Sequence, residues 1–199
     1  AAANLRVVLS NLNRLLGPQL VISRQTVGLN AAARQWTDAA AFERLTAPTA
    51  SIAQLQEGVA LYRGDLLDEF VVRNAPAFDE WLTGRREWLR QRAIQAFWRL
   101  SAAHIEAGAF PAASDALSRL LALEAWLEDA HRRMIGLLAA DGQRSAALAQ
   151  YEQCRRILAD ELGVEPAAET RLLAERARRG AALVPLPTEP AAYLAVGGD

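Results

Sequence analysis

The side chains with the greatest chemical capacity in this sequence are two histidines and one cysteine. His104 and His131 have no second ligand at a metal-site spacing, and Cys154 is the single cysteine. One cysteine cannot form a disulfide within the chain. All three fall on predicted helices, and Cys154 lies on an apolar face, so we interpret them as structural residues. We therefore predict no catalytic residue, no metal and no cofactor.

Acidic residues offer a second route to catalysis. Asp65, Asp68 and Glu69 form one group, and Asp79 and Glu80 form another. Such groups can transfer protons, but on a helical protein they usually belong to solvated faces or caps. All 22 basic residues are arginine, which excludes a P-loop lysine and a lysine Schiff base. Neither a Gly-x-Ser-x-Gly elbow nor a dinucleotide fingerprint is present, so we expect a protein that is not an enzyme.

The charge distribution points to a different function. The chain has 199 residues and a formal net charge of -1. Residues 1–36 contain four arginines and no acid, while the other 163 residues carry a local charge of -5. A basic end on an acidic chain favours contact with a polyanion at that end. Chance variation in a short window is the alternative.

Within the basic end, residues 4–16 have the spacing of an amphipathic helix. The apolar residues occupy one sector of this helix: Leu5, Val8, Leu9, Leu12, Leu15 and Leu16. The opposite sector carries Arg6, Ser10, Asn13 and Arg14. These side chain types can hydrogen-bond phosphates and base edges in a major groove.

A hairpin is predicted next. Gly17 and Pro18 end the helix, and the two short β-type runs 20–23 and 26–29 flank Arg24 and Gln25. An arginine at the tip could touch an adjacent DNA backbone. An ordinary helix and hairpin with a solvated polar face explains the pattern equally well, and both interpretations stay open.

From Trp36 onward the pattern is helical. Thr37 or Asp38 caps a predicted helix to Leu45, and further helices are expected over residues 52–62, 66–70 and 78–107. Pro76 stands where proline opens a helix, and Gly84 is a candidate interruption of the longest one. That helix supplies these core candidates: Trp81, Leu82, Trp88, Leu89, Phe97 and Leu100.

An internal repeat is the most informative feature. Gly108 and Gly142 are 34 residues apart, and their surroundings align without gaps. Large and small residues correspond across the repeat: Phe97 with His131, Leu100 with Met134, Ala113 with Ala147, and Leu120 with Cys154. A period of about 34 residues with a glycine turn is the tetratricopeptide signature. Ser101 and Ile135 stand where this repeat commonly has glycine.

The chain end completes the expected architecture. Residues 145–162 form a helix closed by Gly163, and Pro166 with Glu169 begins a last helix to about Arg179. Residues 181–199 contain three prolines and are expected to be a flexible tail. The longest stretch without Asp, Glu or Arg is twelve residues, against roughly 18–20 for a membrane span, so we expect no membrane contact. The single cysteine fits a reducing compartment, and we expect a cytoplasmic protein.

Three motifs in order resemble a known family. Residues 61–67 (LYRGDLL), 142–152 (GQRSAALAQYE) and 155–166 (RRILADELGVEP) look like the bacterial transcriptional activation domain. This domain occurs in regulators of the antibiotic-regulatory-protein type and in larger signalling ATPases. The resemblance covers roughly residues 36–179 and implies an all-α, tetratricopeptide-like superhelix.

The resemblance also gives residues 1–30 an interpretation. In these regulators a winged-helix DNA-binding domain precedes the activation domain, and residues 4–17 resemble its recognition helix and residues 20–29 its wing. The strands and two helices that precede the recognition helix are missing here. We expect either a fragment of a longer protein or a lost winged helix, and Leu5, Leu9 and Leu12 must then pack on the helical bulk or another chain.

These inferences define the expected domains and function. The domains are residues 1–35, the C-terminal part of a winged helix; residues 36–180, the activation domain; and the tail. The resemblance implies a transcription regulator whose repeat contacts RNA polymerase, a second copy or adjacent domains, and a homodimer is one option. Its DNA-binding residues would be Arg6, Ser10, Asn13, Arg14 and Arg24. Duplex DNA would bind if the winged helix is completed. The alternative is an interaction scaffold or signal relay of a multidomain ATPase, without DNA binding.

Overall fold

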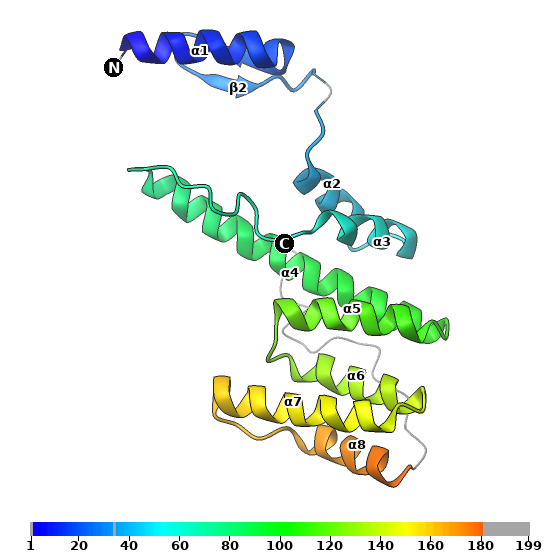
Figure 1. Ribbon diagram of the computed structural model, residues 1–199. Coiled ribbons are helices and arrows are strands. Elements are labelled where there is room, and N and C mark those ends of the chain that lie inside the picture. Colours follow the sequence, from blue (N-terminus) through cyan, green and yellow to red (C-terminus); the bar gives the residue numbers. More distant parts are fainter. Residues whose placement is uncertain (1, 34, 181–199) are drawn as a thin grey trace. The chain divides into compact units, whose positions relative to one another are not determined.

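The computed structural model describes residues 2–33 and 35–180. The chain divides into two compact units, one of residues 1–41 and one that begins at Phe42 (Figure 1). The predicted tail, residues 181–199, lies outside the described residues. Among the residues described, none of the helices is both long and apolar enough to cross a membrane.

The first unit is a helix followed by a hairpin. Helix α1 spans Ala2–Leu16, and a 3-10 turn, η1, spans Gly17–Gln19 with Pro18 in its first positions. Strands β1 (Leu20–Ile22) and β2 (Val27–Leu29) pair antiparallel, with Leu20 opposite Leu29 and Ile22 opposite Val27. The predicted helix and hairpin are therefore confirmed.

Two short helices lead into the repeat. Helix α2 spans Asp38–Leu45, and the Thr37 hydroxyl accepts a hydrogen bond from the Ala40 amide at 3.2 Å, as expected for a cap. Helix α3 spans Ile52–Leu61 and begins with a complete capping box between Ser51 and Gln54. Both predicted helices are present.

The segment after α3 differs from its prediction. The helix expected over residues 66–70 is wrong, because this stretch forms turns in which Leu67 and Glu69 have φ values of 51° and 60°. The Arg86 guanidinium donates hydrogen bonds to the Leu66 carbonyl at 2.8 Å and to the Leu67 carbonyl at 2.6 Å. These two carbonyls therefore have hydrogen-bond partners without the backbone bonds of a helix. Phe70 packs edge-on against Phe78.

The longest helix, α4, spans Pro76–Glu106 and passes through Gly84 without a break. Leu82, Leu89, Phe97 and Leu100 are buried as predicted. Trp81 and Trp88 are not core residues, since they are 53% and 37% exposed. They lie on the face of α4 that also carries Arg85 and Arg92, which bond to the end of α2. Along the first half of α4 this face is open, as a groove lined by Trp81 and Trp88.

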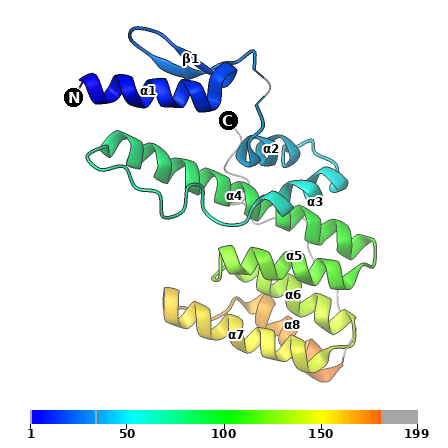
Figure 2. The same cartoon turned by 45° about the horizontal axis from the view of Figure 1, so that its top comes forward.

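The remaining helices form the expected repeat. They are α5 (Phe110–Leu123), α6 (Glu128–Ala140), α7 (Arg144–Leu162) and α8 (Ala168–Arg179). Helices α4 and α5 form one antiparallel pair, α6 and α7 form the next, and α8 packs on both members of the second (Figure 2). Gly108 and Gly142 have φ values of 67° and 76°, which glycine adopts without strain, and each ends the first helix of a pair. The all-α, tetratricopeptide-like fold is thus confirmed.

Candidate functional site

Four of the five residues predicted to contact DNA lie on one face of α1. Arg6, Ser10, Asn13 and Arg14 are all exposed. At about 100° per residue they fall within a sector of about 100°, so one surface could meet them together. Among the described residues, Arg6 and Arg14 form no ion pair, and their positive charge is therefore uncompensated.

The fifth residue, Arg24, lies at the tip of the hairpin. Ser23 and Thr26 close the two-residue turn: the Ser23 amide donates to the Thr26 carbonyl at 2.9 Å, and the Thr26 amide donates to the Ser23 hydroxyl at 2.9 Å. The Gln25 amide also donates to the Ser23 hydroxyl, at 3.2 Å. These bonds fix the turn and leave the Arg24 side chain exposed.

The other face of α1 is apolar and open. Leu5, Val8 and Leu15 are 59%, 52% and 75% exposed, whereas Leu9 is half-buried. The hairpin adds further exposed apolar side chains: Val21, Ile22, Val27 and Leu29. Several large apolar side chains exposed within one short segment normally mark an interaction site.

In the repeat, the titratable residues singled out from the sequence are structural. The His131 Nε2 lies 2.8 Å from the Ala125 carbonyl and its Nδ1 lies 2.7 Å from the Gln150 amide. Burial lowers the pKa of His131, which keeps the ring neutral. Burial raises the pKa of the Cys154 thiol to about 12, so the reactive thiolate is suppressed. His104 lies half-buried on α4, far along the chain from both.

One buried polar cluster was missed from the sequence. The Arg133 guanidinium stacks on the Trp98 ring, 3.6 Å from its centroid, and donates to the Trp98 carbonyl and the Ser101 hydroxyl at 3.2 and 3.0 Å. The sequence held one sign of this cluster, because Ser101 replaces a glycine that is common at this position of the repeat. Its hydroxyl joins α4 to α6, so the cluster belongs to the packing of the repeat.

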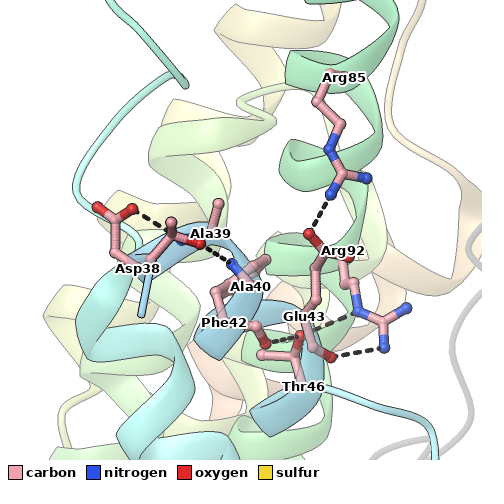
Figure 3. Close-up of polar contacts among 9 residues, drawn as sticks. Asp38, Ala39, Ala40, Phe42, Glu43, Thr46, Arg85 and Arg92 are labelled. Atoms are coloured by element: carbon pink, nitrogen blue, oxygen red, sulfur yellow. Dashed lines mark hydrogen bonds and ion pairs between the residues drawn. The ribbon is translucent and has the colours of Figure 1, made fainter. Parts of the chain in front are cut away.

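Arginine also bonds α2 to α4 (Figure 3), and another arginine of α4 binds the loop after α2. Arg85 forms an ion pair with Glu43, and Arg92 donates to the Thr46 hydroxyl at 3.0 Å. Arg99 donates to the Ala47 and Ala50 carbonyls at 3.0 and 2.7 Å. A guanidinium can bind two acceptors at once. Arg92 also donates to the Glu43 carbonyl in the last turn of α2, and Arg99 binds two carbonyls of the loop between α2 and α3.

The acidic groups named from the sequence are exposed. Asp65, Asp68, Glu69, Asp79 and Glu80 all lie at the surface. Among the described residues there is no group of three or more His, Cys, Asp or Glu side chains that could hold a metal ion.

Comparisons with known proteins agree with this architecture. Residues 29–178 match the family model of the bacterial transcriptional activator domain. Comparison with curated proteins gives no match. Among solved structures, the chain is similar to Mycobacterium tuberculosis EmbR in complex with a low-affinity phosphopeptide, with a TM-score of 0.56 and 23% identity. The match covers 92% of this chain and 51% of that one, so this chain spans about half the length of the EmbR structure.

Proposed function

We propose that this chain, which belongs to the bacterial transcriptional activator domain family, is part of a transcription regulator that meets DNA through residues 4–29 and proteins through its helical repeat. The observation that carries the DNA part is the exposed face of α1, on which Arg6, Ser10, Asn13 and Arg14 lie opposite an apolar face. Residues 1–35 would form the end of a winged helix and residues 36–180 the activation domain.

The side chains on this face would contact different parts of the DNA. Arg6 and Arg14 are exposed cations without an ion pair among the described residues, and they suit phosphates or guanine edges. Ser10 and Asn13 lie between them and can donate to and accept from base edges. Arg24, on a turn fixed by the Ser23 hydroxyl, would contact the neighbouring phosphate backbone.

The apolar face of α1 supports the winged-helix assignment. Leu5, Val8 and Leu15 expose most of their surface, which is costly in water unless another element covers them. In a complete winged helix, the preceding helices would cover this face and hold α1 against the groove. We therefore expect duplex DNA binding from the protein with a complete winged helix, in the bacterial cytoplasm.

The repeat supplies the protein-binding part of the proposal. Paired helices joined by glycine turns form a rigid stack, and such stacks serve mainly as protein-binding surfaces. RNA polymerase, a second copy of the chain, or adjacent domains of a longer protein are the partners considered.

DNA binding by the full-length protein tests this function. A fluorescent duplex from the region upstream of its own gene is titrated between 50 and 200 mM salt. We expect affinity to fall steeply with salt, and the alanine variants of Arg6, Arg14 and Arg24 each to reduce the slope of log affinity against log salt by about 1. Arg156→Ala, an exposed arginine on α7, is the control and should leave the slope unchanged.

Two results would contradict the DNA part. One is undetectable or salt-insensitive binding by the wild-type protein. The other is loss of binding in Arg156→Ala equal to the loss in the α1 variants. Protein contacts without any DNA binding would favour the interaction scaffold.

A further inference from the structure

An exposed stripe of alternating small and large residues runs along the first half of α4. Its members lie four, three and four positions apart and are called here the α4 stripe: Ala77, Trp81, Gly84 and Trp88. At about 100° per residue these intervals place all four within a sector of about 60°. Each of the four is exposed. Alternating intervals of three and four residues are typical of a helix that pairs with another helix along a narrow seam.

The small residues of the α4 stripe leave an open groove. Its volume is about 460 Å³, and it is lined by these residues: Ala77, Glu80, Trp81, Gly84, Arg85 and Trp88. Gly84 contributes open space, since apart from its own helical turn no atom lies within 4 Å of the position where a Cβ would stand.

The lining of this groove matches the hole that receives a large side chain in a helix pair. In such pairs, each seam residue inserts into a hole formed by four residues of the facing helix. For Trp81 of an identical, parallel helix, the seam pattern gives this set: Ala77, Glu80, Trp81 and Gly84. All four line the groove, so α4 carries both the large side chain and the hole that fits it.

Trp81 is held in position to act as the inserted side chain. It is 53% exposed, and its ring centroid lies 5.6 Å from that of Phe78. Phe78 contacts Phe70 in turn, with 6.0 Å between the ring centroids. An exposed indole that its neighbours already restrain loses little further freedom on binding.

The charges beside the α4 stripe are separated by flank. At helical spacing, Glu80 and Glu87 fall on one flank of the stripe, and Arg85 and Arg92 fall on the other. In a parallel pair of such helices, each glutamate faces the arginine five positions further along the other helix. In an antiparallel pair, like flanks meet and like charges repel. The pattern is therefore complementary to itself in the parallel orientation.

Glu80 and Arg85 are the pair that a second copy can complete. Glu80 is exposed and has no ion pair among the described residues. Arg85 contacts Glu43 through one terminal nitrogen, and a guanidinium has further N–H donors for a second carboxylate. Glu87 and Arg92 already have partners within the chain, so the assignment rests on the first pair.

We propose that two copies of this chain associate through the α4 stripe, with their α4 helices side by side and parallel. Trp81 of each copy inserts between Ala77 and Gly84 of the other, and Glu80 of each faces Arg85 of the other. The contact is isologous, because the same surface serves on both copies. This inference rests on the proposed protein-binding role of the repeat and names a second copy as its partner.

Sedimentation equilibrium of the full-length protein over about a hundredfold range of concentration measures this association. We expect a reversible dimer, and Trp81→Ala should raise its Kd by about tenfold or more, since it removes the inserted ring. Trp126→Ala is the control, because Trp126 is 44% exposed and lies at the start of α6, so the Kd should not change. A monomer at every concentration, or equal weakening by both variants, would overturn the proposal.

Charge reversal tests the pairing of Glu80 with Arg85. Glu80→Arg and Arg85→Glu should each raise the Kd by about tenfold or more, because each places like charges opposite one another. An equimolar mixture of the two variants has opposite charges at both contacts, so it should dimerise like wild type. Absence of this rescue would refute the pairing. A thermal melt of each variant separates loss of fold from loss of association, and Glu80→Arg, at an exposed and unpaired side chain, should melt close to wild type.

Oxidative cross-linking with diamide tests the parallel orientation. Gly84→Cys places a thiol on the seam, where the same position of both copies meets in a parallel pair. Thr83→Cys, at an exposed position beside the α4 stripe, is the control, and the native Cys154 is buried. We expect a disulfide-linked dimer from Gly84→Cys and a monomer from Thr83→Cys. No cross-link in the first variant, or equal cross-linking in both, would contradict the parallel seam.

The outcome can be separated from that of the proposed function. If wild type binds DNA with the expected salt dependence but stays monomeric, the α4 inference fails and the regulator proposal stands. If wild type dimerises through the α4 stripe but does not bind DNA, the DNA part of the proposed function fails and the α4 inference stands.

Discussion

Arginine supplies both the expected recognition chemistry and the internal fastening of this lysine-free chain. Arg92 and Arg99 hold the ends of α2 and the loop before α3, and Arg133 bridges α4 and α6 through Trp98 and Ser101. Arg6, Arg14 and Arg24 have no ion pair among the described residues and project from α1 and the hairpin tip. The same residue type therefore has two roles, which burial and available acceptors distinguish.

The buried histidine should make stability depend on pH. Burial lowers the pKa of His131 below its ordinary value near 6.5, so the unfolded chain takes up a proton that the folded chain excludes. The stability gained by keeping His131 neutral is fully present above about pH 6.5, the pKa in the unfolded chain, and is lost as the pH falls below it. We expect the free energy of unfolding in urea to decrease from pH 7 to pH 5, by at most about 1.4 kcal/mol per pH unit from this group.

The variant that isolates this effect is His131→Gln, which should have a smaller difference between pH 7 and pH 5 than wild type. Equal pH dependence in wild type and His131→Gln would remove the role assigned to the buried ring.

At the scale of elements, the turns of the repeat need glycine at Gly108 and Gly142, where φ is positive, whereas Gly84 lies inside a helix and could be replaced. Gly142 has φ of 76° with open space around its Cβ position, so Gly142→Ala adds backbone strain without a clash. We expect it to lower the free energy of unfolding by about 1–2 kcal/mol. Urea denaturation monitored by circular dichroism measures the change.

Gly84→Ala should have the opposite sign and serves as the comparison. Gly84 lies inside α4 with helical backbone, and no atom lies within 4 Å of its Cβ position. Alanine there should stabilise the protein by about 0.5–1 kcal/mol, since glycine costs more conformational entropy in a helix. Two changes of the same sign would contradict the turn assignment.

The elements themselves were largely predictable from the sequence, and their surroundings were not. Helical spacing predicted α1 to within a turn, and the 34-residue interval from Gly108 to Gly142 predicted the helix pairs. Helical spacing could not reveal which face of α4 stays open along its first half, so Trp81 and Trp88 were wrongly placed in the core.

Long-range side-chain contacts account for the other differences. The turns at residues 66–70 depend on Arg86, which lies about twenty residues further along the chain and donates hydrogen bonds to the Leu66 and Leu67 carbonyls. An open groove is lined by Trp126 and by Leu158 and Val164, which lie more than thirty positions further along the chain, so no local sequence pattern could predict it. For the DNA-facing residues, the face of α1 was predictable, whereas their role stays a prediction.

At the scale of the whole molecule, two unlike parts make up a nearly neutral chain. Residues 1–36 carry four arginines and no acid, and the repeat carries the excess of acids. Under the proposed function, the first part would meet a polyanion and the repeat would meet protein partners. The near-zero net charge therefore results from the cancellation of a basic part and an acidic part.

We propose that residues 4–29 bring the helical repeat to DNA, where the repeat contacts a protein partner. The most direct test of this claim is run-off transcription by RNA polymerase with promoter occupancy measured in the same reaction, using full-length wild type and the Arg6→Ala, Arg14→Ala double variant. We expect the double variant to lose occupancy and transcript together, by tenfold or more at the wild-type midpoint concentration, and to regain both when its concentration is raised. Wild-type occupancy by the double variant, or restored occupancy without restored transcript, would contradict the claim.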